Sequence, residues 1–303
     1  MRHVLVTGAA GGLGTCVCSR LAATGDTVFA TDADAGALRR FRGMQGVVPF
    51  RMDVTSARDV AHVRTRIESL ADGLDGLVYC AGVFAAGALI EADERAMERA
   101  FGINVMGAFR TVKAFFPLLQ RRSGTVVLIG TELSHCAMPF NGPYTVSKSA
   151  LQTYADALRR ELMFIGMRVA VVQPGAIRTP LLSGARPTAD GRTGRTLFPA
   201  QLELMRGMLA REWETGMEPA DVARVVVRAL RSRRPRPVYR VGNDPFRVML
   251  GRLPASWTDL LIRLFVTVRS AGRHARGRHP QTGRAALSAA RAASGRSRGP
   301  GRR

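Results

Sequence analysis

The segment His3-Val-Leu-Val-Thr7-Gly8-Ala-Ala-Gly-Gly12-Leu13-Gly14 lies at the start of the 303-residue chain and sets its fold. Residues 3–6 have the apolar character of a short strand, and Leu13, Val17 and Leu21 recur at helical spacing after the glycines. A glycine-rich turn between a strand and a helix lets backbone N–H groups approach a pyrophosphate, whose charge the helix N-terminus favours. We therefore predict a phosphate-binding turn that opens a βαβ unit.

The rest of the chain continues this alternation of strand and helix. Further strands are expected at residues 27–31, 47–51, 76–79, 125–129, 169–172 and 237–241, with helical periodicity between them. Strands and helices that alternate at this spacing, with apolar strand segments, indicate a parallel sheet covered on both faces. The predicted fold class is α/β, a Rossmann-like doubly wound parallel sheet with helices on both faces. Candidate chemical residues follow the strand ends, where open α/β sheets bind ligands.

A second segment, Tyr144-Thr-Val-Ser-Lys148, lies near the start of a long helical stretch. Residues four apart share one face of a helix, so the phenol and the ammonium are within reach of each other. A tyrosine with a pKa of about 10 carries protons poorly at neutral pH, and a nearby ammonium lowers that pKa. All but two of the 45 basic residues are arginine; the lysines are Lys113 and Lys148. The pair predicts a general acid/base, although an ordinary exposed pair has the same spacing.

Asp32 ends the second predicted strand, eighteen residues after Gly14. A carboxylate at this position can accept hydrogen bonds from both hydroxyls of an adenosine ribose and would repel a 2′-phosphate. This predicts NAD rather than NADP. The alternative is that Asp32 or Asp34 caps the next helix, expected from Ala35 to Phe41.

Composition limits the remaining possibilities. The formal charge of +22 is uneven, because eleven arginines and no acidic residue lie between Arg263 and Arg303. The four cysteines show neither C-x-x-C spacing nor partnered histidines, which favours buried free thiols and predicts no metal site. No signal peptide precedes the first strand and no apolar segment reaches the roughly 18 residues of a membrane span, so a cytoplasmic protein is expected.

Over residues 3–245 these motifs resemble the short-chain dehydrogenase/reductase (SDR) family. The motifs that carry the likeness are Thr7-Gly8 with Gly12 and Gly14, Asp53, Cys80-Ala81-Gly82, Asn104, Tyr144 with Lys148, and Pro174 to Thr179. By resemblance, the cofactor-binding residues are Thr7, Gly8, Gly12, Leu13, Gly14, Asp32, Asp53, Val54, Ala81, Gly82, Asn104, Tyr144, Lys148, Pro174, Gly175, Ile177 and Thr179. The resemblance also implies a homo-oligomer.

Two positions depart from the family pattern. Cys80 replaces an asparagine, which removes a hydrogen-bonding side chain but leaves the glycine turn usable. Thr131 occupies the position of the catalytic serine, thirteen residues before Tyr144. Threonine keeps a hydroxyl that can donate to a carbonyl oxygen, although its methyl group narrows the pocket. We favour Thr131, and Ser134 is the alternative.

The resemblance implies an oxidoreductase that interconverts a secondary alcohol and a ketone with NAD(P)(H). In this reading Tyr144 transfers the proton, Lys148 lowers its pKa and holds the nicotinamide ribose, Thr131 orients the substrate oxygen and Asn104 anchors a water chain. The hydride chemistry belongs to the cofactor. The alternative is a non-catalytic dinucleotide-sensing protein of the same fold, for which Thr131 and Cys80 leave room.

The segments after the sixth strand bear on the substrate. Residues 180–217 carry Leu and Met at helical spacing. This pattern indicates either a lid over the substrate or a helix that packs on the core. Residues 246–271 form an amphipathic helical extension that suits protein packing better than an anionic membrane surface. Both favour an apolar substrate, lipid-, steroid- or retinoid-like, and family members acting on such compounds often have similar extensions.

Residues 272–303 are rich in arginine, alanine and glycine and contain almost no large apolar residue. Such a segment cannot bury enough surface to order itself, so a solvated disordered tail is expected. Its arginines could bind nucleic acid or phospholipid. Because no aromatic residues or nucleic-acid-binding module accompany them, nucleic acid is not the expected partner.

Overall fold

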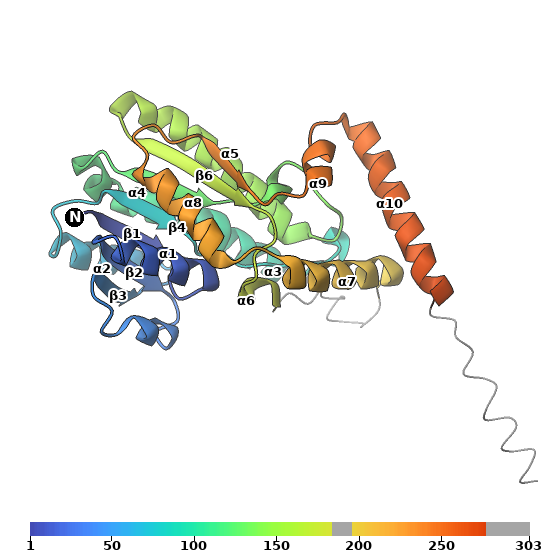
Figure 1. Cartoon of the computed structure of the whole chain (residues 1–303), viewed down its shortest axis with the longest axis horizontal. Coiled ribbons are helices and arrows are strands. Elements are labelled where there is room, and N and C mark those ends of the chain that lie inside the picture. Colours follow the sequence, from blue (N-terminus) through green and yellow to red (C-terminus); the bar gives the residue numbers. More distant parts are fainter. Residues whose placement is uncertain (184–195, 277–303) are drawn as a thin grey trace, which may run out of the picture. The chain divides into compact units, whose positions relative to one another are not determined.

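The computed structural model describes residues 1–183 and 196–276, and the chain divides into two compact units, Met1–Asp259 and Leu260–Arg303. In the first unit, parallel strands form one sheet in the order β3-β2-β1-β4-β5-β6-β7; Figure 1 labels β3, β2, β1, β4 and β6 of this sheet. The strands are β1 (His3–Thr7), β2 (Thr27–Asp32), β3 (Val47–Arg51), β4 (Gly76–Tyr79), β5 (Thr125–Ile129), β6 (Arg168–Pro174) and β7 (Val238–Val241). The order reverses between β1 and β4, as in a doubly wound sheet.

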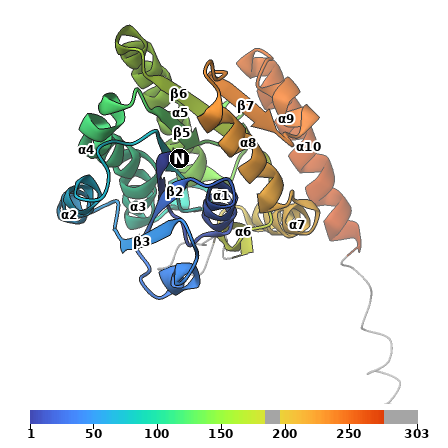
Figure 2. The same cartoon turned by 60° about the vertical axis from the view of Figure 1, so that its left-hand side comes forward.

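Helices cover both faces of this sheet (Figure 2). On one face, α1 (Gly12–Ala22) and α8 (Pro219–Arg231) pack against the strands. On the other, α2 (Ala57–Glu68), α4 (Gly107–Arg121) and α5 (Gly142–Leu162) do so. Successive strand residues supply the two cores in turn, because strand side chains alternate between faces. The predicted α/β Rossmann-like architecture is confirmed.

The first unit contains further elements, most of them short. They are η1 (Ala37–Phe41), η2 (Leu89–Glu91), α3 (Glu94–Phe101), the π-helical turn η3 (Gly102–Met106), η4 (Glu132–Ser134), η5 (Met163–Ile165), α6 (Pro180–Ser183), α7 (Pro199–Thr215) and α9 (Pro245–Leu250). The helix expected at 35–41 is therefore a 3₁₀ helix over 37–41. The expected lid contains α6 and α7, and its residues 184–195 lie outside the described residues.

The predicted C-terminal extension contains α9 and α10 (Ala255–Arg276). Helix α10 continues beyond residue 271, where the tail was expected to begin. The rest of the expected tail, 277–303, lies outside the described residues. Within the described part of the chain, no helix has the length and apolar character needed to cross a bilayer.

Candidate active site

The carboxyl ends of the parallel strands bring the predicted site residues to one edge of the sheet. Thr7 ends β1, Asp32 ends β2 and Pro174 ends β6. Tyr79 ends β4 and is followed by Cys80-Ala81-Gly82, and Thr131 comes two residues after β5. The sheet topology thus gathers residues that are more than 160 positions apart in the chain.

The glycine-rich turn is closely packed. Gly8 has φ +61°, and a Cβ there would lie 2.6 Å from the backbone nitrogen of Ala81. A Cβ on Gly14 would lie 2.1 Å from the carbonyl oxygen of Gly8. Helix α1 begins after Gly11 with no side-chain cap and no acidic residue in its first turn. Its N-terminus is thus suited to an anion, and the turn fits the pyrophosphate of a dinucleotide.

The turn adjoins the segment after β4. The Thr7 hydroxyl accepts a hydrogen bond from the Ala81 amide at 3.3 Å. A Cβ on Gly82 would lie 3.2 Å from Asn104 Oδ1 and 3.6 Å from Lys148 Nζ. Gly82 therefore lies beside Asn104 and Lys148, and the neighbouring Ala81 amide connects this segment to Thr7 at the glycine-rich turn.

The structure distinguishes the two aspartates after β2. Asp34 accepts a hydrogen bond from the Ala37 amide at 3.0 Å, so it caps η1. Asp32 instead accepts hydrogen bonds from the amides of Ala10, at 3.0 Å, and Asp34, at 3.1 Å. The Asp32 carboxylate is thus held against the glycine-rich turn. Arg40 lies beside the same turn and donates to the Thr15 hydroxyl at 3.0 Å.

Two other predicted cofactor segments lie at the same edge. Asp53 accepts hydrogen bonds from the amide and hydroxyl of Thr55, at 2.8 and 2.7 Å, and Val54 is buried. After β6, the Gly175 amide donates to the Val241 carbonyl, and Ile177 forms a bridge with Met217.

Thr179 ends the segment after β6 and lies on the glycine-rich turn. A Cβ on Gly12 would come within 2.8 Å of Thr179 Cγ2. The strand order reverses between β1 and β4, and β6 lies on the β4 side of this point. The segment from Pro174 to Thr179, which starts at the end of β6, thus reaches the glycine-rich turn from that side.

Tyr144 lies in the first turn of α5 and is almost fully buried. Burial raises the pKa of Tyr144 to about 12; a hydrogen bond with the Thr131 side chain lowers it and the charge of Glu132 raises it. The net direction is opposite to the one predicted from the Tyr/Lys spacing, because the cost of burying a phenolate outweighs the favourable contacts. Thr131 is buried beside it and caps η4.

Lys148 is buried one helical turn further along α5. Its ammonium donates to the carbonyl oxygen of Ile129 at 2.8 Å and lies 6.0 Å from the centre of the Tyr144 ring. Burial lowers the pKa of Lys148 to about 8. Tyr144 and Lys148 therefore form a buried pair, and the ordinary exposed pair is excluded.

Asn104 lies in the π-helical turn η3 and is fully buried. Its Oδ1 accepts from the Val83 amide at 2.9 Å, and its Nδ2 donates to the Val83 carbonyl at 3.1 Å and to the Ser147 hydroxyl at 2.9 Å. Ser147 in turn donates to the Tyr144 carbonyl at 2.8 Å. Asn104 thereby connects the segment after β4 with the first turn of α5.

The two family departures have different surroundings. The Ser134 hydroxyl donates to the Lys148 carbonyl at 3.3 Å, whereas the Thr131 hydroxyl bonds with the Tyr144 side chain. Cys80 is partly buried against the core on the α1 side, and burial raises its thiol pKa to about 12. A thiol with this pKa stays protonated at neutral pH and does not add a charge to the site.

The sequence prediction missed several residues around Tyr144. Ser147 lies inside the Tyr144–Lys148 segment. Its hydroxyl, three residues after Tyr144, was the available signal. The Phe84 ring lies 4.6 Å from the Tyr144 ring, and Phe140 packs with Phe198 at 5.4 Å. These contacts depend on loop conformation and gave no periodic signal.

Comparisons with known proteins agree with this geometry. The family model for short chain dehydrogenases matches residues 2–190. The 3-amino-tetrahydro-pyrrolizinone reductase of Xenorhabdus hominickii is 28% identical over 261 residues, which cover 80% of this chain and 87% of that protein. Retinol dehydrogenase 5 of Homo sapiens is 29% identical over 284 residues, covering 86% of this chain and 87% of that protein.

Other matches are shorter. The mitochondrial D-beta-hydroxybutyrate dehydrogenase of Rattus norvegicus is 31% identical over 189 residues, so the match spans 57% of this chain and about half (54%) of that relative. Among solved structures, a short chain dehydrogenase/reductase from Burkholderia phymatum in complex with NAD has a TM-score of 0.72. It is 24% identical over 86% of this chain and 95% of its own, a likeness of fold. With the family model matched over most of the Rossmann-like unit, the chain belongs to the short-chain dehydrogenase family and is an oxidoreductase.

Proposed function

We propose that the protein interconverts a secondary alcohol and a ketone, using NAD(H), with Tyr144 as the general acid/base. The observation that carries the proposal is that Tyr144 is buried, that the Thr131 side chain lowers its pKa, and that its ring lies 6.0 Å from the Lys148 ammonium. General acid/base catalysis needs a proton carrier within hydrogen-bond reach of the reacting oxygen. Thr131 supplies a second hydroxyl at the same place.

The cofactor would bind along the carboxyl edge of the sheet. The glycine-rich turn and the N-terminus of α1 would hold its pyrophosphate, and Asp32 its adenosine ribose. The segment from Pro174 to Thr179 would hold the nicotinamide end, and Asp53 and Val54 the adenine. When bound, the nicotinamide ring accepts or supplies the hydride. Asp32 favours NAD; among similar solved structures, the one from Burkholderia phymatum is in complex with NAD and the one from Burkholderia cenocepacia with NADP.

Each catalytic side chain has a distinct task in this proposal. Tyr144 protonates the ketone oxygen in reduction and takes the proton from the alcohol in oxidation. Thr131 donates to the substrate oxygen and fixes its position. The Lys148 ammonium, 6.0 Å from the Tyr144 ring, stabilises the phenolate when it forms. Asn104 holds the first turn of α5 in register with the segment after β4.

The side chains around Tyr144 support the proposed substrate class. Phe84 lies against the Tyr144 ring. Ala86, Met205 and Leu209 form a buried apolar cluster, with Phe84 and Phe140 packed against it. Aromatic and methionine side chains adapt to large apolar ligands. An apolar substrate, lipid-, steroid- or retinoid-like, suits this surface, and human retinol dehydrogenase 5 is among the relatives.

Substitution of Tyr144 by phenylalanine tests the proposal. Tyr144→Phe removes the proton carrier but keeps the ring against Phe84, so turnover should disappear while NADH binding persists. Turnover is followed by the absorbance of reduced nicotinamide, and NADH binding by fluorescence titration. Full activity in the variant would refute the role of Tyr144.

A substrate and cofactor panel identifies the finer chemistry. Steroids, retinoids and medium-chain alkanols, each as alcohol and ketone, are assayed with NAD and NADP in parallel. The apolar cluster predicts higher kcat/KM for the larger apolar compounds, and Asp32 predicts a preference for NAD. A clear preference for NADP would contradict the ribose role and would direct attention to Arg40, beside the glycine-rich turn.

A further inference from the structure

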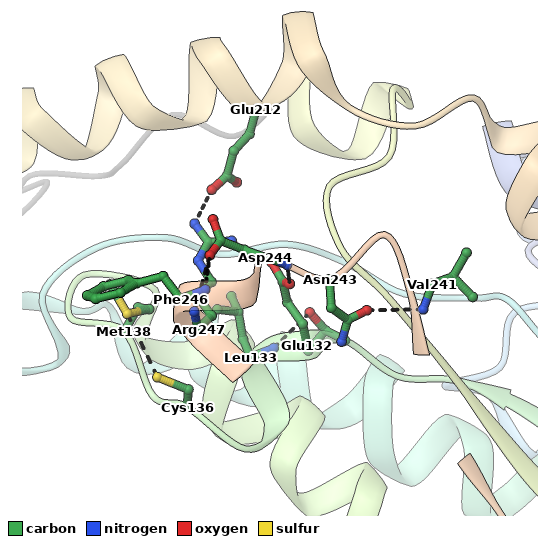
Figure 3. Close-up of polar contacts among 11 residues, drawn as sticks. Glu132, Leu133, Cys136, Met138, Glu212, Val241, Asn243, Asp244, Phe246 and Arg247 are labelled. Carbon is green, nitrogen blue, oxygen red and sulfur yellow. Dashed lines mark hydrogen bonds and ion pairs between the residues drawn. The ribbon is translucent and has the colours of Figure 1, made fainter. Parts of the chain in front are cut away.

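Three charged side chains from distant parts of the chain, Glu132, Glu212 and Arg247, meet at one place (Figure 3). Arg247 of α9 donates through Nη1 to Glu132 Oε1 at 2.6 Å and through Nη2 to Glu212 Oε1. Glu132 belongs to η4 and directly follows Thr131, and Glu212 belongs to α7. One guanidinium thus joins the catalytic loop, the expected lid helix and the C-terminal extension.

The pairing is needed because these charges are buried. The side chains of Glu132 and Arg247 are only 4% and 11% exposed. A buried carboxylate without a partner is strongly destabilising, and the planar fork of arginine can serve two carboxylates at once. A lysine could not reproduce this arrangement, because its ammonium is a single point charge. The three side chains therefore act as one unit.

Glu132 also anchors the start of α9. Its second carboxylate oxygen accepts the Asp244 amide at 2.6 Å. The Asp244 side chain then caps α9 by accepting from the amides of Phe246, at 2.8 Å, and Arg247, at 3.2 Å. Both oxygens of Glu132 are thus engaged by the segment that carries Arg247, which fixes the loop containing Thr131.

The cluster lies close enough to Tyr144 to affect its protonation. The negative charge of Glu132 raises the pKa of Tyr144, because it disfavours a second negative charge nearby. The other groups that face Tyr144 in the described residues are the Thr131 hydroxyl, the uncharged Phe84 ring and the Lys148 ammonium. Arg247 pairs with Glu132, and Glu212 shares the same guanidinium from α7.

We propose that Arg247 is a positioning residue of the reaction given under Proposed function, on which this inference rests. It holds Glu132 and therefore Thr131 in place, offsets the charge of Glu132 next to the general acid/base, and fastens α7 to the catalytic loop.

The test compares four variants of the full chain by their pH–rate profiles for alcohol oxidation. Arg247→Met removes the charge and keeps the apolar stem, and Glu132→Gln removes the opposing charge with little change in shape. Arg247→Lys keeps the charge without the fork. Arg206→Met is the matched control, because Arg206 forms an exposed ion pair with Glu203 on α7. NADH titration and thermal unfolding accompany each profile.

Oxidation needs the Tyr144 phenolate, so its rate rises with pH through the pKa of this group. Arg247→Met should shift the pH–rate profile to higher pH by about one unit. At pH values below the pKa of Tyr144, kcat/KM should therefore fall about tenfold. Glu132→Gln should shift the profile to lower pH. Arg247→Lys should keep the profile near that of the wild type but lose turnover through misplacement of Thr131. The control Arg206→Met should change neither the position of the profile nor the turnover.

The opposite shifts of Arg247→Met and Glu132→Gln support the inference, because a merely structural role would change stability without moving the profile. If both profiles stay at the wild-type position, the inference is overturned. Where Arg247→Met does not fold, Glu132→Gln decides alone, by the presence or absence of a downward shift. Tyr144→Phe separates the two proposals, because activity in that variant would refute the proposed function itself.

Discussion

At the scale of single residues, the site places two ionisable groups where burial disfavours their charged forms. Burial raises the pKa of Tyr144 to about 12 and lowers that of Lys148 to about 8. Burial therefore shifts both groups toward their neutral forms, while Lys148, with a pKa of about 8, still carries its charge at pH 7. Such opposed environments are typical of groups that exchange protons in catalysis.

Lys148 should consequently cost the protein stability. Its folded pKa is depressed, so below about pH 8 the folded state carries the full penalty of a buried ammonium, and the penalty fades as the pH rises from about 8 to 10.5. Lys148→Met should raise the unfolding free energy by about 2 kcal/mol at pH 7, after loss of the hydrogen bond to Ile129. Turnover should be lost.

Urea unfolding of wild type and Lys148→Met at pH 7 and pH 10 measures this difference. The gain should be smaller at pH 10, where the wild-type lysine is neutral in the folded state. An equal or larger gain at pH 10 would show that the ammonium is not the source.

Thr131 should carry the role of the second hydroxyl. Thr131→Val preserves shape but removes the donor, so kcat/KM should fall about 10²-fold, as for loss of one donor to a reacting oxygen. Thr131→Ser should retain most activity. Ser134→Ala is the control, because that hydroxyl donates to the Lys148 carbonyl. A larger loss in Ser134→Ala than in Thr131→Val would exchange the two assignments.

At the scale of elements, the strands and the α1 turn were predictable, but the surroundings of Asn104 were not. The central strands are apolar segments buried on both faces, a pattern that can be recognised directly in the sequence. The π-helical turn that carries Asn104 depends on its hydrogen bonds with Val83 and Ser147, which come from other elements. Phe84 and Glu132 were missed for the same reason, since only the folded loops bring them to Tyr144 and Arg247.

The glycine-rich turn should tolerate no side chain at Gly14. A Cβ there would lie 2.1 Å from the Gly8 carbonyl oxygen, so Gly14→Ala must shift the backbone that faces the pyrophosphate. NADH affinity should fall by more than about tenfold, measured by fluorescence titration. Gly36→Ala is the control, because its Cβ would approach only the side chains of Asp34 and Arg39. Unchanged affinity in Gly14→Ala would remove the turn from the binding site.

At the scale of the whole molecule, the proposed site lies within Met1–Asp259. The order and type of the elements in this unit could be read from periodicity and glycine placement. The pairing of Arg247 with Glu132 and Glu212 could not, because an arginine among 45 basic residues has no sequence mark that identifies its partners. None of the residues named for the proposed site lies in the segment from 272 onward.

Deletion of residues 272–303 should therefore leave turnover largely intact, because it removes nine arginines but no residue named for the site. Steady-state kinetics on the truncated and full chains test this, with a salt series on DNA and on anionic vesicles in parallel. Binding that the deletion abolishes would give the segment a separate role. Loss of turnover would contradict the expectation.

The parallel sheet also has a practical consequence for handling the enzyme. Since every strand runs toward the proposed site, the strands all start at the opposite edge, where β1 begins at His3. A biosensor surface or resin coupled ahead of β1 would hold each molecule by its far edge and leave the entrance for the coenzyme open to the buffer.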